Sequence, residues 1–272
     1  ILIITFVKNR NLHKRSMYLV ISLAVADALV GGFSCSISSI NLGSMCHLWK
    51  EVEPYGGSRI WHRIYFPLWV LFPIASLADL TAISVERMHA TFRPFRHRVI
   101  TKRFYAVVIA ASWITAALLS TSLVFLHNHV NKIYAWNSFS LICLFVICLS
   151  YSFIAVKMFC GRHSPHRRSV NRERKLTKTL FIVTVVSLLM WLPHITTSLL
   201  LLSTDMLSSY SLLQRYQVAS IFLFLYYANS LVNPILYATR MSDFRRALIV
   251  LFCRNPQNQV SPAFIMTSQT GA

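Results

Sequence analysis

Six long apolar stretches, separated by short polar segments, dominate this sequence. They cover residues 17–40, 64–85, 104–126, 133–156, 179–203 and 216–239. The last four contain no Asp, Glu, Lys or Arg. A helix needs about 20 apolar residues to cross roughly 30 Å of hydrocarbon. Residues 1–7 are a shorter apolar piece that we interpret as the inner end of a further span. The pattern predicts an all-α membrane protein with seven transmembrane helices, the first of them truncated.

The composition excludes other classes of protein. Only 13% of the 272 residues are charged, 55% are hydrophobic, and the mean hydropathy is +0.53. A soluble domain devotes about a quarter of its residues to charge, so this chain has too few charges for a water-facing surface. The apolar content excludes a disordered chain, and six cysteines are too few for a disulfide scaffold of this length.

The basic residues predict the orientation. Alternate loops hold 4, 6, 8 and 4 of the 27 Lys and Arg residues, in residues 8–15, 87–103, 157–178 and 240–254. The other five lie in the opposite set of loops. Because cytosolic loops carry the excess of Lys and Arg, the N-terminus is expected outside and the C-terminus in the cytosol. We therefore interpret the net charge of +19 as a topology signal facing anionic membrane lipid, and we expect no nucleic-acid partner.

The segment after the seventh span predicts a short helix on the membrane surface. Apolar residues recur at helical spacing over residues 242–253, with Arg245 and Arg246 on another face. Cys253 ends this segment and is a candidate for palmitoylation, although an unmodified thiol fits as well. The predicted seven-helix domain therefore spans residues 1–253, and residues 254–272 form a polar cytosolic tail.

Polar motifs occur one per span, at matching depths. They are LAVAD at 23–27, ERM at 86–88, the lone Trp113, WLP at 191–193 and NPILY at 233–237. Their order resembles that of the rhodopsin-like (class A) G-protein-coupled receptors, from Lys8 to about Cys253. The resemblance implies a plasma-membrane receptor that is not an enzyme. Its partners would be a heterotrimeric G protein and, through the phosphorylated tail, arrestin.

The resemblance implies a latch at the cytosolic ends of the spans. Arg87 follows Glu86, as in the family motif that has an acid before this arginine, and is expected to reach Glu173 at the base of the sixth span in the resting state. Breaking the pair would free Arg87 for the G protein, with Tyr151 and Tyr237 approaching each other. The alternative is that Arg87 only reaches toward the membrane interface as a topology residue.

The same resemblance implies an activation hinge. Trp191 and Pro193 lie in the sixth span, and Asn233 and Pro234 lie in the seventh. Proline removes a helix hydrogen bond and kinks the helix. The alternative is that these are ordinary kinks packed by aromatic side chains.

A buried acid near the middle of the second span predicts a polar site. Asp27 is costly as an isolated ion in hydrocarbon. Ser76, Trp191, Asn229 and Asn233 match family positions that surround an allosteric sodium ion bound by this aspartate, and hard oxygen ligands suit that ion. A water-filled structural cluster is the alternative.

A second acid, Asp79, lies within the third span. An indole N–H and a hydroxyl can satisfy a buried carboxyl group. We expect Trp113 to donate to Asp79, with Ser22 as a second partner, in a structural role.

Pocket positions carried over from the family predict an aromatic ligand cavity that opens outward. They are Trp69, Phe72, Pro73, Trp136, His194, Thr197, Tyr226 and Tyr227. Trp69 stands where amine receptors place an aspartate, so a lipid, an uncharged small molecule or an aromatic-rich peptide fits better than an amine. The alternative is that half of these residues only pack the bundle.

Two departures from the family narrow the resemblance. His62 stands where most members have the cysteine of the outer disulfide, and Cys143 replaces a common proline. In both departures the chain resembles the melanocortin, cannabinoid and lysolipid receptor group.

We expect a signalling receptor. A non-signalling decoy is the main alternative, and a channel or transporter is disfavoured by only 7 glycines and the lack of a repeat.

Overall fold

A computed structural model describes residues 17–45, 64–126, 128–160, 168–203 and 212–240. Its helices are α2 (Met17–Leu29), the π-helix η2 (Val30–Ser34), α3 (Cys35–Met45), α4 (Phe66–Phe92), α5 (Pro94–Val99), α6 (Lys102–Phe125), α7 (His129–Cys160), α8 (Arg168–Ser203) and α9 (Leu212–Arg240). No strand occurs within these described ranges. Residues 1–7, the predicted surface helix at 242–253, Cys253 and the tail 254–272 lie outside them.

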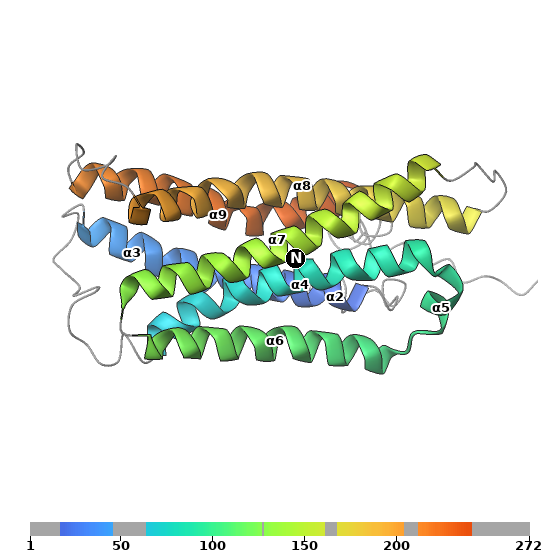
Figure 1. Cartoon of the computed structure of the whole chain (residues 1–272), viewed down its shortest axis with the longest axis horizontal. Helices are drawn as coiled ribbons and strands as arrows, with labels where there is room; N and C mark the ends of the chain where they lie inside the picture. Colours follow the sequence, from blue (N-terminus) through green and yellow to red (C-terminus); the bar gives the residue numbers. More distant parts are fainter. Residues whose placement is uncertain (1–16, 46–63, 127, 161–167, 204–211, 241–272) are drawn as a thin grey trace, which may run out of the picture.

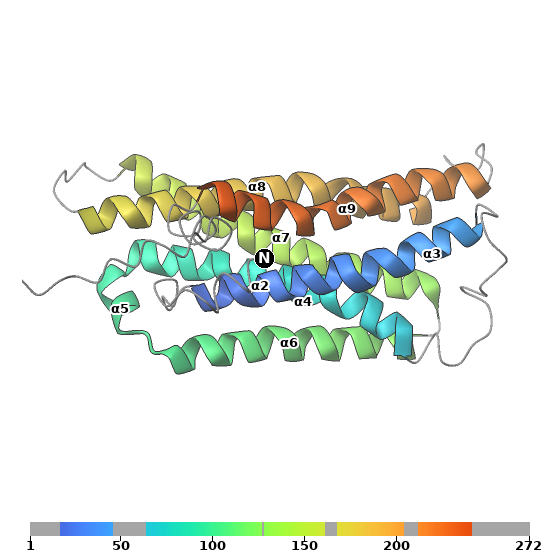
Figure 2. The ribbon, with the colours of Figure 1, turned by 180° about the vertical axis from the view of Figure 1, so that it is seen from behind.

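All the described helices except the short α5 run roughly along the long axis of the molecule (Figures 1 and 2). α8 and α9 lie side by side at one edge, and α6 lies at the opposite edge. α4 is central, because it packs against α2, α6 and α7. The central position of α4 explains why it carries buried polar residues at several depths, since each of them can reach a neighbouring helix.

The outer faces of the bundle are apolar. Val107 and Leu118 of α6 are each 66% exposed, and Ile142 and Phe145 of α7 are 63% and 65% exposed. Exposed apolar side chains are favourable next to lipid tails and unfavourable in water. A helix also satisfies its own polar backbone groups, so it can lie in hydrocarbon. The exposed apolar faces therefore agree with a protein that lies in a membrane.

Four of the described helices are long and apolar enough to cross a membrane. They are Met17–Ile40, Phe66–Phe92, Lys102–Phe125 and Val130–Lys157. α8 contains a shorter apolar helix, Thr184–Leu200. In α9, polar residues such as Asn229 and Asn233 lower the apolar content, and both are buried inside the bundle.

α8 begins eleven residues before the apolar stretch predicted at 179–203. Its 36 residues correspond to about 54 Å at 1.5 Å per residue, which exceeds the hydrocarbon thickness of roughly 30 Å. A helix of this length is longer than a single crossing needs, so the apolar stretch predicts where a span crosses lipid rather than where the helix begins.

The C-terminal half of the second span contains a π-helical turn. η2 joins α2 to α3 and includes Gly31 and Gly32. Ser34 ends this turn, and its hydroxyl donates to the Trp69 carbonyl at 2.9 Å. Such turns change the rotation of the following residues, so η2 sets which side chains of α3 face α4.

Candidate functional site

A cavity of about 280 Å³ lies between α4, α6, α7, α8 and α9. Aromatic and aliphatic side chains with a few polar groups form its lining. The lining residues are Phe66, Trp69, Val70, Pro73, Leu123, Lys132, Ile133, Trp136, His194, Ser198, Leu223, Tyr226 and Tyr227. This volume is near the lower end of the roughly 300–1,000 Å³ typical of small-molecule sites. The cavity therefore suits one compact ligand or the end of a longer one.

Six of the eight pocket residues predicted from the sequence line this cavity. Phe72 and Thr197 do not. Phe72 packs edge-on against Phe33 of η2, with ring centroids 5.6 Å apart. Thr197 instead donates its hydroxyl to the Pro193 carbonyl at 2.7 Å. Lys132 and Ser198 also line the cavity and were not predicted from the sequence, since neither stands at a position marked by a motif.

One wall of the cavity is held by hydrogen bonds between three helices. The Trp69 indole N–H donates to the Ser38 hydroxyl at 3.0 Å and to the Tyr227 hydroxyl at 2.9 Å. The two hydroxyls are themselves 2.8 Å apart. Trp69 thus joins α3 and α9 to α4, and its ring is fixed rather than free to turn.

The cavity floor is built on Tyr226. Its ring lies 5.0 Å from that of His194 and 5.2 Å from that of Trp191. The Tyr226 hydroxyl is buried and has no hydrogen-bond partner among the residues that the structure describes. At the rim, the Lys132 ammonium lies 4.9 Å from the centre of the Phe66 ring. Both groups can donate a hydrogen bond to a ligand.

Below this floor, Asp27 accepts three hydrogen bonds. Its Oδ1 accepts from Ser76 at 2.8 Å and from Ser230 at 3.2 Å, and its Oδ2 accepts from Asn233 at 2.9 Å. The Asp27 side chain is 3% exposed. The structure thus brings together three of the predicted ion-site residues and adds Ser230, which no motif had marked.

Two further oxygens of this cluster fit a small cation. Asn229 Oδ1 and Asn233 Oδ1 are buried and have no hydrogen-bond partner within the described ranges. Ser76, Trp191 and Asn229 border a small void here. Oxygen atoms of this kind suit a hard cation. In contrast, no three His, Cys, Asp or Glu side chains of the described part gather as a transition-metal site requires.

Of the two partners predicted for Asp79, the structure confirms Ser22 but not Trp113. Its Oδ1 accepts from Ser112 and its Oδ2 from Ser22, both at 2.6 Å. The Trp113 indole donates to the Ser22 hydroxyl at 3.0 Å, not to Asp79. The expected direct bond from Trp113 was therefore wrong, because Ser22 stands between the two side chains. Ser112 was missed, although it directly precedes Trp113.

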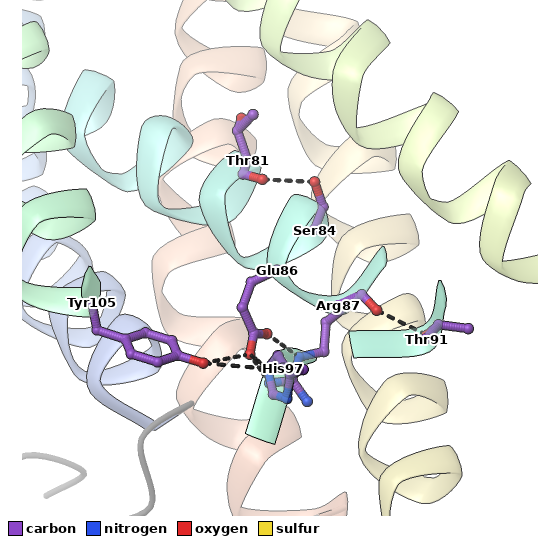
Figure 3. Close-up of polar contacts among 7 residues, drawn as sticks. All are labelled: Thr81, Ser84, Glu86, Arg87, Thr91, His97 and Tyr105. Atoms are coloured by element: carbon purple, nitrogen blue, oxygen red, sulfur yellow. Dashed lines mark hydrogen bonds and ion pairs between the residues drawn. The ribbon is translucent and has the colours of Figure 1, made fainter. Parts of the chain in front are cut away.

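At the C-terminal end of α4, Glu86 and Arg87 form a buried ion pair (Figure 3). Arg87 Nη2 donates to Glu86 Oε1 at 2.6 Å, and Arg87 Nε donates to Oε2. His97 Nε2 lies 2.6 Å from Oε1, and the Tyr105 hydroxyl donates to the same oxygen at 3.0 Å. The carboxylate of Glu86 is thus shared by α4, α5 and α6.

A lysine of α7 reaches the same end of α4. Lys157 Nζ donates to the Thr91 carbonyl at 2.7 Å and lies 4.6 Å from the centre of the Phe92 ring. A cation is favourable at the C-terminus of a helix, where the carbonyl groups lack partners. Lys157 therefore fixes α7 against α4 beside the Glu86–Arg87 pair.

The sequence profile of the family "7 transmembrane receptor (rhodopsin family)" matches residues 1–237. The chain belongs to this family. Members are receptors that signal through G proteins, and they are not enzymes. Family membership confirms the predicted seven-helix bundle and the resemblance drawn from the motifs.

Several curated receptors are similar to this receptor. Melanocortin receptor 5 of Mus musculus is 27% identical over 274 residues, which cover 91% of this chain and 77% of that protein. Trace amine-associated receptor 5 of Rattus norvegicus is 28% identical, and the match covers 93% of this chain and 80% of that protein. The histamine H2 receptor of Homo sapiens is 27% identical, and the match covers 93% of this chain and 74% of that protein.

Apart from Glu86 and Arg87 on α4, the predicted hinge and latch residues of the receptor fall on α7, α8 and α9. Trp191 is 3% exposed and Pro193 lies inside α8. Tyr151 is buried on α7, with its ring 5.5 Å from that of Phe181 on α8. The side chains of Glu173, Pro234 and Tyr237 lie outside the described residues, so the predicted Arg87–Glu173 contact stays a prediction.

Proposed function

We propose that this receptor converts the binding of an extracellular ligand into activation of a heterotrimeric G protein, by outward movement of the inner end of α8. The observation that carries this proposal is the buried Glu86–Arg87 pair. Arg87 is 1% exposed. A buried arginine is costly unless it is held by an acid, so a change that releases it has a large effect on the balance between two states.

A continuous set of contacts supports communication between the cavity and the polar cluster. Tyr226 lines the cavity and packs on Trp191. Trp191 in turn borders the same void as Asn229 and Ser230. Pro193 interrupts the hydrogen bonding of α8 two residues after Trp191. A ligand that shifts Tyr226 therefore acts on the helix that has to move.

Release of Arg87 from Glu86 and Glu173 would let Arg87 contact the C-terminal helix of the G protein. Tyr151 and Tyr237 would then approach each other. In this proposal the N-terminus is outside, the C-terminus is cytosolic, and the protein resides in the plasma membrane. The basic inner loops would face anionic lipid, and the tail would be available to arrestin. Cys253 would carry a palmitoyl group.

The Asp27 cluster would hold an allosteric sodium ion in the resting receptor. Asp27 would supply the charge, and the oxygens of Ser76, Asn229, Ser230 and Asn233 would supply neutral ligands. The ion would balance the charge of Asp27 inside the bundle. Two buried amide oxygens without partners among the described residues support this assignment.

The ligand we propose is a lipid, a small molecule or an aromatic-rich peptide with a hydrogen-bond acceptor, rather than an amine. Lys132 is the only charged side chain, and no acid occurs, among the described residues that line the cavity. Tyr226 can donate at the floor. Two of the relatives are named for amines, but here Trp69 stands where an amine would need its acid.

Nucleotide exchange on a G protein tests this function. The receptor would be reconstituted in lipid nanodiscs and screened with matched acid, neutral and amine ligands that share one aromatic body. We expect an acid or neutral ligand to accelerate exchange and Arg87→Ala to abolish the response while surface expression is kept. Ligand binding without any exchange would support the decoy alternative instead.

A further inference from the structure

The carboxylate of Glu86 is held from two sides beyond its contact with Arg87. His97 Nε2 lies 2.6 Å from Oε1, the Tyr105 hydroxyl lies 3.0 Å from it, and these two partners are 3.3 Å from each other (Figure 3). His97 comes from α5, which follows α4, and Tyr105 comes from α6. The three side chains form a cluster that joins three consecutive helices at one point.

Helix geometry alone does not provide the Glu86–Arg87 contact. Neighbouring residues on a helix point about 100° apart and do not face each other. A two-point contact between residues 86 and 87 therefore requires that the carboxylate be turned toward the arginine and kept there. His97 and Tyr105 are the groups that contact Oε1 from outside α4.

The cluster is shielded from water. Tyr105 is 1% exposed, and the side chains of Glu86 and His97 are 8% and 19% exposed. Hydrogen bonds to a carboxylate are worth more in such surroundings than at a surface, because water competes less for the charge. Loss of either partner should consequently be measurable.

We propose that His97 and Tyr105 are positioning residues that orient Glu86 so that it retains Arg87 in the resting receptor. This inference rests on the proposed G-protein function of Arg87. His97 and Tyr105 would thereby connect the short helix α5 and the start of α6 to the Glu86–Arg87 pair.

Basal nucleotide exchange by the nanodisc receptor tests the inference without a known ligand. We expect His97→Ala to raise basal exchange about tenfold, the size expected when one hydrogen bond to a charged group is lost, and Tyr105→Phe to raise it about threefold. Opening of the inner end of α8, followed by a spin label, should rise in parallel. Thermal unfolding and surface expression show that each variant folds.

A conservative variant separates positioning from packing. In His97→Gln the side-chain amide nitrogen can take the place of Nε2 as the donor to Glu86. We expect basal exchange and basal opening within about twofold of the original, because a donor to the carboxylate is kept. His89→Gln is the matched control, since the His89 ring lies 6.2 Å from that of His97, and it should leave basal exchange unchanged.

Glu86→Gln distinguishes the positioning role of His97 and Tyr105 from the proposed function of the Glu86–Arg87 pair. If it raises basal exchange and His97→Ala does not, the positioning role is refuted while the proposed function stands. A fall in basal exchange in His97→Ala would also refute it, since His97 would then compete with Arg87 for Glu86. If neither variant changes exchange or opening, the latch function fails and the inference fails with it.

Discussion

The buried carboxyl of Asp79 gives a prediction whose size can be worked out from its contacts. Asp79 is 0% exposed and accepts one short hydrogen bond from Ser22 and one from Ser112. Asp79→Asn keeps one acceptor and gains an amide donor, and serine hydroxyls can reverse their direction to match. We therefore expect a loss of less than about 1 kcal/mol in the free energy of unfolding, since hydrogen bonds between membrane helices are worth about 0.6 kcal/mol on average.

Asp79→Ala removes both bonds and leaves a void. The Ser22 hydroxyl loses its acceptor, whereas Ser112 still donates to the Ile109 carbonyl at 2.9 Å. Two lost interhelical bonds plus a small cavity give a destabilisation of about 2–4 kcal/mol. At roughly 2–4 °C per kcal/mol for a chain of this size, the Tm should fall by about 5–15 °C, against less than about 4 °C for the asparagine.

Thermal unfolding of the purified receptor, with surface expression in cells, provides the assay. Ser112→Ala and Ser120→Ala form a matched pair on α6. Both serines donate to a carbonyl three residues earlier, but only Ser112 also reaches Asp79. Ser112→Ala should cost about 1 kcal/mol and Ser120→Ala about half of that or less. A hydrogen-bonding role for Asp79 is refuted if Asp79→Asn is as damaging as Asp79→Ala, because the charge itself would then be required.

Three further predictions concern other polar contacts. Asn137 on α7 and Ser198 on α8 exchange hydrogen bonds of 3.0 and 3.2 Å, so a double-mutant cycle with alanine should give a coupling of about 0.5–1.5 kcal/mol in thermal unfolding; additive losses would contradict this. Trp69→Phe keeps an aromatic side chain but removes the indole donor to Ser38 and Tyr227, and should lower stability by about 1–2 kcal/mol, whereas an unchanged Tm would show that these bonds contribute nothing. Sodium chloride, compared with choline chloride at equal ionic strength, should stabilise the receptor by about 1 kcal/mol at several times the dissociation constant. Asp27→Asn should abolish that difference, and a sodium effect that persists in this variant would place the ion elsewhere.

Much of the site could be predicted from the sequence because its residues are marked by chemistry that is rare in a membrane. An acid in an apolar stretch, such as Asp27 or Asp79, has to meet polar partners. A proline inside a span, such as Pro193, has to interrupt the helix. These properties belong to single residues and their immediate neighbours, so no knowledge of the packing is needed to recognise them.

The partners of those residues could not be predicted in the same way. Ser230, Ser112 and His97 are ordinary residues in sequence, and each becomes part of a site only because a helix is rotated and placed to bring it there. The direct bond expected between Trp113 and Asp79 was wrong for this reason, since a rotation of the helix determines whether Ser22 lies between them.

The sequence by itself determined the class of protein, its membrane-crossing stretches and the depth of each polar motif. Those depend on the length and polarity of local segments, which the hydrocarbon thickness selects directly. Only the tertiary structure decided that Trp69 is fixed by Ser38 and Tyr227, and that Glu86 is shared with His97 and Tyr105. Such contacts join separate helices, and their geometry depends on the rotation and spacing at which the side chains of neighbouring helices pack.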